Sequence, residues 1–140
     1  MKRFLKVALL TGVLVAGLGA QGVTAATYDQ GPVQYAKSVS QRCVGGVKIE
    51  DPVSGVAYNV KFDGYSGTIT FTINGGVLAF DTDHSSHVIT GIWIKGGPDY
   101  AWAYFYTGGE DNDGGLTAPS NPNSGGYYGV SHVCLTLDKK

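Results

Sequence analysis

Polar and apolar residues alternate one by one between residues 67 and 73, and this is the most regular pattern in the chain. Three apolar side chains fall on one side of this stretch and three threonines on the other. A period of two predicts a β-strand with one apolar face and one hydroxyl-bearing face. Asn74–Gly76 supplies residue types that accept positive φ, and the apolar run resumes over Val77–Phe80. This order predicts a tight β-hairpin.

A second hairpin is predicted around the turn Gly96–Asp99. The runs on either side, Val88–Lys95 and Tyr100–Tyr106, are rich in β-branched and aromatic residues, which are the types that favour strands. Side chains of a strand point alternately to its two faces. One face of the second run carries Trp102, Tyr104 and Tyr106, and the other carries Ala101, Ala103 and Phe105.

Short runs of the same kind predict further strands near Cys43–Glu50, Val56–Phe62 and Tyr127–Leu137. No stretch of useful length repeats apolar residues with the period of an amphipathic helix. Short strands separated by turn signals are typical of a sandwich or barrel. The sequence therefore predicts an all-β fold, a single antiparallel β-sandwich of jelly-roll or immunoglobulin-like type.

The segment Gly108–Gly126 has few apolar residues apart from Leu116, Ala118 and two prolines. We expect it to be a long surface loop that Leu116 and Pro119 anchor and that Asn121–Asn123 turns back. Because binding residues often lie on such loops, we expect any partner to touch this loop and the neighbouring aromatic strand.

The first 25 residues have the features of a secretory signal. A basic start is followed by a small apolar run, Val7–Ala20, and by the small residues Val23–Ala25 at a cleavage position. The apolar run is shorter than the roughly 20 residues that cross a bilayer. We assign residues 1–25 to a signal peptide, 26–42 to an N-terminal arm or an edge strand, and 43–140 to the sandwich.

Removal of the signal changes the net charge. It takes away three of the 10 Lys and Arg residues and none of the 11 acidic ones, which leaves 115 residues with a net charge of −4. A chain of this size forms one domain with one core. Its negative charge and its lack of a Lys/Arg cluster argue against nucleic acid as a partner. We expect a released protein with no membrane span, extracellular or, in a source with an outer membrane, periplasmic.

Cys43 and Cys134 are the two cysteines of the chain. In an oxidising compartment an even pair in a small domain favours a disulfide, and two buried free thiols are the alternative. Closing a loop of roughly 100 residues removes about 4–5 kcal/mol of unfolded-chain entropy in the simple loop-closure model. The bridge would join the first and the last strong strands and indicates that these strands are neighbours.

Four segments carry motifs in a specific order: RCVGGVKIEDP at Arg42–Pro52, IKGGP at Ile94–Pro98, GLTAPSNPNSGG at Gly115–Gly126 and YGVSHVC at Tyr128–Cys134. Together they resemble a family of β-rich modules of secreted and surface-anchored bacterial proteins. The resemblance covers most of the mature chain and implies a β-rich fold that acts outside the cell. Relatives are often modules of long adhesin-like proteins, and the family has no settled activity.

The chain departs from the family pattern at two points. Many relatives have a histidine where Thr117 stands. Their last cysteine falls about two residues after Cys134, a shift that keeps a side chain on the same face of a strand and is compatible with the bridge. The resemblance implies a structural role for His132, which would hydrogen-bond the backbone of a neighbouring loop.

Three histidines invite a metal-binding interpretation. Asp83–His87 contains two imidazoles and a carboxylate, and His132 is the third histidine; zinc sites use such ligands. However, His84 and His87 would point to opposite faces of a strand. We therefore prefer the interpretation that Asp83–His87 is a polar turn.

Glu110–Gly114 resembles a fragment of a calcium-binding loop, because oxygen ligands alternate before a turning glycine. Asp111 and Asp113 are weak candidate calcium ligands on this basis. The glutamate that completes a full loop is missing, so a solvated turn is the preferred interpretation.

Aromatic residues give the stronger binding hypothesis. Flat aromatic faces beside Asn and Asp suit sugar rings or peptides. The alternative is that the same side chains fill the core, and we expect some of each. The candidate ligand surface consists of Trp102, Tyr104, Tyr106, Asn121, Asn123 and Tyr127.

No established catalytic constellation occurs in the sequence. There is no Gly-x-Ser-x-Gly motif, and Ser131 and His132 would face opposite ways on a strand. We expect a secreted non-enzymatic domain for extracellular or surface interactions, with no cofactor. A carbohydrate-binding module is the alternative, and exposure of the aromatic row would favour it. A small metal-dependent hydrolase is less favoured and would require the three histidines to cluster.

Overall fold

The computed structural model describes residues 27–36, 43 and 46–140. The predicted signal peptide lies outside the described residues. Within them the chain forms strands and turns and no helix, so the prediction of an all-β fold is confirmed. The strands are β1 Gln30–Ala36, β2 Val47–Glu50, β3 Ala57–Phe62, β4 Tyr65–Asn74, β5 Val77–Asp83, β6 His87–Lys95, β7 Tyr100–Glu110, β8 Asn112–Thr117 and β9 His132–Lys139.

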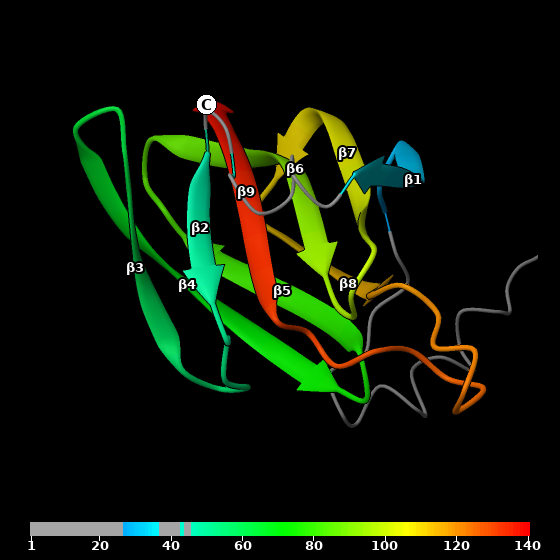
Figure 1. Ribbon diagram of the computed structural model, residues 1–140. Helices are drawn as coiled ribbons and strands as arrows, with labels where there is room; N and C mark the ends of the chain where they lie inside the picture. The colour runs from blue at the N-terminus through cyan, green and yellow to red at the C-terminus, as the bar shows by residue number, and fades with distance from the viewer. Residues whose placement is uncertain (1–26, 37–42, 44–45) are drawn as a thin grey trace, which may run out of the picture.

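Two antiparallel sheets form the sandwich (Figure 1). One sheet has the strand order β1-β7-β6-β9-β2, and the other has the order β3-β4-β5-β8. In the residues that the structure describes, no helix is long and apolar enough to cross a membrane.

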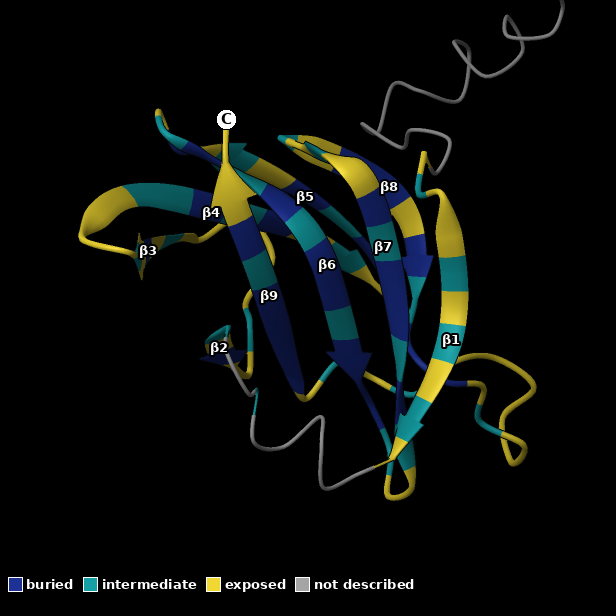
Figure 2. Cartoon of the chain, turned by 90° about the horizontal axis from the view of Figure 1, so that it is seen from above, coloured by how far each residue is buried: buried dark blue, intermediate teal, exposed yellow. Residues whose placement is uncertain are grey.

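The core lies between the two sheets and is built by the alternation seen in the sequence. On β4, Ile69 and Phe71 are fully buried, while Thr72, the next residue along the same strand, is exposed. On β6 buried and half-buried residues alternate from His87 to Gly91, whereas on β9 four successive residues, His132–Leu135, are buried. Figure 2 shows the buried residues concentrated along β6, β7 and β9. The largest fully buried core residues include Tyr104, Phe71, Ile69, Leu78, Ile89, Ile92, Ile94, Leu116 and Leu135.

Both predicted hairpins are confirmed. β4 and β5 join through Gly75 and Gly76, whose φ values are 60° and 86°. Such φ values are the reason for glycine in a two-residue hairpin turn. β6 and β7 pair antiparallel across the Gly96–Asp99 turn, with Lys95 opposite Ala101.

The prediction of one long loop over Gly108–Gly126 is wrong. β7 continues to Glu110, and β8 returns along β5 with Leu116 opposite Leu78. Pairing with β5 supplies hydrogen-bond partners for the backbone of β8 and buries Leu116 in the core. These interactions outweigh the low strand propensity of the glycines in β8. The surface loop that remains is residues 118–131, between β8 and β9.

The sandwich also begins earlier than residue 43, because β1 is an edge strand that pairs with β7. At the opposite edge of the same sheet, β2 pairs with β9 and Lys48 stands opposite Cys134. A disulfide links Cys43 to Cys134, with the two Cα atoms 5.4 Å apart. The predicted bridge and the predicted proximity of the first and last strong strands are both confirmed.

Candidate binding site at the loop end of the sandwich

A recess of about 140 Å³ opens at one end of the sandwich, between the β6–β7 turn and the 118–131 loop. We call it the loop-end recess. It combines two tyrosine rings and two prolines with a carboxylate and a hydroxyl. Its lining residues are Gly96, Asp99, Tyr100, Pro119, Ser120, Pro122 and Tyr128.

Close contact between Tyr128 and Gly97 shapes the recess. A Cβ atom placed on Gly97 would lie 2.5 Å from the Tyr128 ring, and the φ of Gly97 is +76°. Only glycine accepts both conditions without strain. At Gly96 a Cβ atom would lie 2.6 Å from the backbone oxygen of Gly129. The two glycines therefore let the loop pack directly on the β6–β7 turn.

Backbone hydrogen bonds hold the 118–131 loop in place. Tyr128 N–H donates to the Pro119 oxygen at 2.9 Å, and Asn121 N–H donates to the Gly126 oxygen at 2.8 Å. The Asn121 side chain accepts a bond from Asn123 N–H at 2.9 Å, an Asx turn. Because these hydrogen bonds already order the loop, it loses little conformational entropy when a ligand binds.

The loop is also tied to the end of β6. Ser131 donates from its backbone N–H and from its hydroxyl to the backbone oxygen of Lys95, at 2.7 Å and 3.0 Å. Ala118 N–H donates to the Gly76 oxygen in the β4–β5 turn at 2.8 Å. Three of the four motif segments, those at Ile94–Pro98, Gly115–Gly126 and Tyr128–Cys134, therefore meet at this end of the molecule.

The size of the recess limits what it can hold. Sites for drug-sized ligands and cofactors usually have about 300–1,000 Å³, so this recess accepts one ring or one side chain of a larger partner. Tyr100 and Tyr128 offer aromatic faces, and Asp99 and Ser120 offer a carboxylate and a hydroxyl. Such a set can stack on an apolar or sugar ring and accept hydrogen bonds from its edge.

Two of the predicted ligand residues belong to the core instead. Tyr104 and Tyr106 are each 2% exposed. The Tyr104 hydroxyl accepts a bond from Thr117 N–H at 2.9 Å and lies 3.0 Å from Thr117 Oγ1. Burial, above all other causes, raises the pKa of both phenols. They are wrong as ligand residues because their face of β7 points between the sheets.

The other four predicted ligand residues lie nearer the surface. Trp102 is half-buried and packs against the core. Asn121 is half-buried, whereas Asn123 and Tyr127 are exposed. Sequence reasoning missed Tyr100 as a recess residue, although it starts the predicted aromatic strand and follows the glycine-proline turn.

Asp113 is a buried structural acceptor. Thr27 N–H and Gly114 N–H donate to its Oδ1, and the Tyr106 hydroxyl donates to its Oδ2, each at 2.8 Å. Asp111 is half-exposed and lies 3.4 Å from Lys140 Nζ. The two candidate calcium ligands thus serve different partners, and no group of three or more His, Cys, Asp or Glu residues converges for a metal in the part of the chain that the structure describes.

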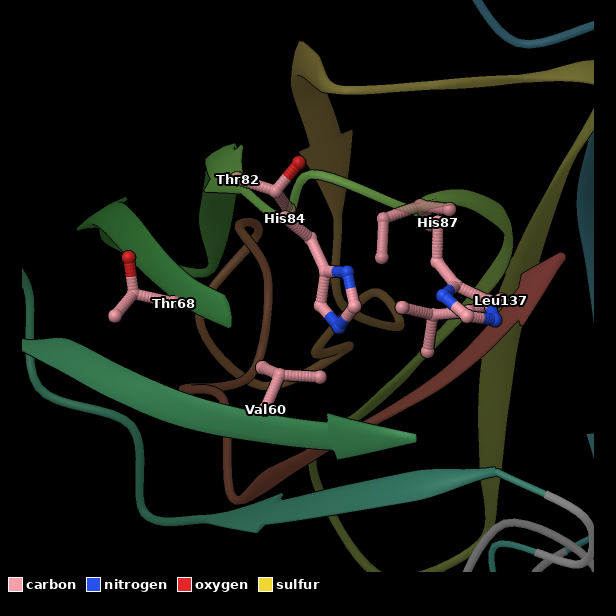
Figure 3. Close-up of a pocket in the computed structure, with 7 residues that line it drawn as sticks. Val60, Thr68, Thr82, His84, His87 and Leu137 are labelled. Atoms are coloured by element: carbon pink, nitrogen blue, oxygen red, sulfur yellow. The ribbon is translucent and has the colours of Figure 1, made fainter. Parts of the chain in front are cut away.

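His84 and His87 lie close together and do not occupy opposite faces of one strand. They flank the bend between β5 and β6, where the alternation of a strand does not apply, and their ring centroids are 5.1 Å apart (Figure 3). His132 stands opposite Lys95, at the other end of β6 from His87. The three histidines therefore do not cluster.

Comparison with known proteins gives no relative from which the role of the site could be inferred. No protein-family model, curated protein or solved structure matches the chain. The family resemblance of the motif segments accordingly stays an expectation.

Proposed function

We propose that the protein is a secreted, non-enzymatic domain for extracellular or surface interactions, and that the loop-end recess is where it binds a partner. The observation that carries this proposal is the convergence of the IKGGP turn and the 118–131 loop around an open, preformed recess. Tyr128 packs on Gly97, so the aromatic wall is in place before a ligand arrives.

The disulfide, the size of the recess and the sequence motifs are consistent with this role. A disulfide that links residues 91 positions apart suits an oxidising compartment. The small recess and the absence of a catalytic motif in the sequence favour recognition over chemistry.

A carbohydrate-binding module is the second candidate function. The buried positions of Tyr104 and Tyr106 remove the aromatic row on which that idea first rested. The recess offers a different basis, since Tyr100 and Tyr128 stand beside the Asp99 carboxylate. An aromatic face next to a hydrogen-bond acceptor is a common way to hold a sugar ring.

The experiment compares the wild-type protein with Tyr100→Ala and Tyr128→Ala variants on two sets of immobilised probes, extracellular-matrix proteins and glycans. We expect wild type to bind members of one set and each variant to lose at least about tenfold in affinity, the equivalent of about 1.4 kcal/mol. Binding to glycans would identify the carbohydrate module.

The matched control is Tyr65→Ala, which removes a tyrosine that is 49% exposed and does not line the recess. Its binding should equal that of the wild type. The proposal fails if Tyr128→Ala binds as well as wild type while its melting temperature is unchanged, because the recess would then not be the site.

A further inference from the structure

Asp99 gives the loop-end recess a negative charge. This residue lines the recess and is exposed. Its carboxylate forms no hydrogen bond or ion pair with the residues that the structure describes. None of the described residues that line the recess is a lysine or an arginine. The recess therefore presents a carboxylate that is free to pair with a ligand.

The lysine nearest to this turn in the sequence has a partner of its own. Lys95 ends β6 and is 3% exposed, and its Nζ donates a hydrogen bond to the backbone oxygen of Gly97. Lys95 does not line the recess. Asp99 is thus the formal charge that a ligand in the recess meets directly.

The walls beside the carboxylate are aromatic. The Tyr128 ring is held against Gly97. The centroids of the Tyr100 and Trp102 rings lie 6.4 Å apart, with an angle of 32° between the ring planes, so Trp102 supports Tyr100 from within the strand. The face of an aromatic ring attracts cations, most often the guanidinium group of an arginine.

An arginine side chain fits this combination better than a neutral sugar. Its guanidinium group is planar and weakly hydrated, so it can stack on an aromatic face while its edge donates to a carboxylate. A sugar ring can use the same aromatic face, but it leaves the charge of Asp99 without a counterion. The Ser120 hydroxyl, which also lines the recess, is a further acceptor for guanidinium N–H groups.

The size of the recess and the net charge of the protein agree with this occupant. About 140 Å³ is below the range of about 300–1,000 Å³ that whole small ligands need, and it suits one side chain of a larger partner. Without residues 1–25 the chain has a net charge of −4. Such a charge speeds the association of a basic partner.

We propose that the loop-end recess binds an arginine side chain of a protein partner, which pairs with Asp99 and stacks on the rings of Tyr100 and Tyr128. This inference rests on the proposed function, because it names the chemistry of the partner at the same site. It requires a partner with an exposed arginine and binding that weakens as salt is added.

The first experiment needs no identified partner. The disulfide-bonded protein is titrated with a capped three-residue peptide that has a central arginine between two glycines, and then with the same peptide carrying citrulline, which keeps the shape of arginine without its charge. The ring signals of Tyr100 and Tyr128 in ¹H–¹³C spectra should shift in a saturable way with the arginine peptide. The citrulline peptide should bind at least about fivefold more weakly, and about 0.5 M NaCl should also weaken the arginine peptide.

Variants then test each contact. Asp99→Asn keeps the shape of the side chain and removes its charge, and it should weaken the arginine peptide by about three- to tenfold, between the effects of an exposed ion pair and of a hydrogen bond to a charged group. Tyr100→Leu should weaken it by about two- to fivefold, whereas Tyr100→Phe keeps the aromatic face and should bind like wild type. The matched control is Asp81→Asn, which removes an equal charge from an exposed position on β5 outside the recess and should leave binding unchanged.

Failure of this inference differs from failure of the proposed function. Tyrosine signals that ignore the arginine peptide, or that respond equally to the citrulline peptide, overturn the assignment of arginine, and this comparison needs no variant. An Asp99→Asn variant that keeps its affinity for a matrix protein, when Tyr128→Ala loses it, also overturns it; the recess is then the site of an uncharged group, and glycan binding would identify a sugar. If Tyr128→Ala keeps that affinity while the arginine peptide still binds through Asp99, the proposed function fails and recognition of arginine stands.

Discussion

The phenol of Tyr106 donates a 2.8 Å hydrogen bond to Asp113, and both residues are buried. This contact joins β7 to β8 inside the sandwich. Asp113 also accepts two backbone N–H groups, one of them from Thr27 just before β1. A single carboxylate therefore links the N-terminal strand, the β7–β8 hairpin and the core.

Replacing Tyr106 with Phe tests this link. The variant loses a hydrogen bond to a charged acceptor, which is worth about 1.5–3 kcal/mol, and we expect the free energy of unfolding to fall by that amount. Urea unfolding near pH 7 measures it. Tyr65→Phe is the control, because Tyr65 is exposed and its change should stay within about 0.5 kcal/mol. A Tyr106→Phe variant as stable as wild type would contradict the role of the contact.

Alkaline pH should destabilise the domain through the same tyrosines. Burial raises the pKa of Tyr104 and of Tyr106, and the hydrogen bond to Asp113 adds to the effect at Tyr106. The folded protein thus keeps protons that the unfolded chain releases above its tyrosine pKa of about 10. Their contribution is complete below that pH and is lost as the pH rises further.

The measurement is the urea midpoint of wild type and of a Tyr104→Phe/Tyr106→Phe double variant between neutral and strongly alkaline pH. The wild-type midpoint should fall more steeply above about pH 10. Equal slopes in the two proteins would show that other groups cause the alkaline loss.

The disulfide should contribute a large part of the free energy of unfolding. Replacing both Cys43 and Cys134 with Ser should lower the free energy of unfolding by about 2–5 kcal/mol. Intact-mass measurement of the wild type should show a loss of two hydrogens that a reductant reverses. Two thiols that react with an alkylating agent without reduction would contradict the bridge.

Gly97→Ala should damage the loop-end recess beyond the cost of backbone strain. A left-handed conformation costs an L-residue about 1–2 kcal/mol. Gly55 has a similar φ of +83° with nothing within 4 Å of the added atom, so Gly55→Ala is a control for strain alone. The clash with the Tyr128 ring should add about 1–3 kcal/mol to the cost at Gly97. Equal losses in the two variants, measured by thermal or urea unfolding, would mean that the ring moves aside freely.

Much of the fold follows from local signals in the sequence. The alternation over β4 and the Asn74–Gly76 turn suffice to predict one hairpin, because both depend on neighbouring residues only. β8 escaped prediction because its pairing with β5 is set by residues more than 30 positions away in the chain, such as Leu78 opposite Leu116. Local propensity carries no information on such a partner.

The sites were harder to predict for the same reason. The motifs at Ile94–Pro98 and Tyr128–Cys134 were visible as segments, but nothing in either shows that the Tyr128 ring packs on Gly97. The sequence favoured a polar turn for Asp83–His87, but nothing in that pattern shows that the bend brings the rings of His84 and His87 together. The burial of His84 also depends on Gly67 in a different strand.

The bond between Cys43 and Cys134 has a mechanical consequence. A force that pulls on the chain before residue 43 and after residue 134 passes through this covalent bond and bypasses the strands between them. Only β1 and the part of β9 beyond Cys134 can then be peeled away, while β2 to β8 stay enclosed. The sandwich can therefore bear tension between its two ends without unravelling, for as long as the surroundings keep the two sulfurs oxidised.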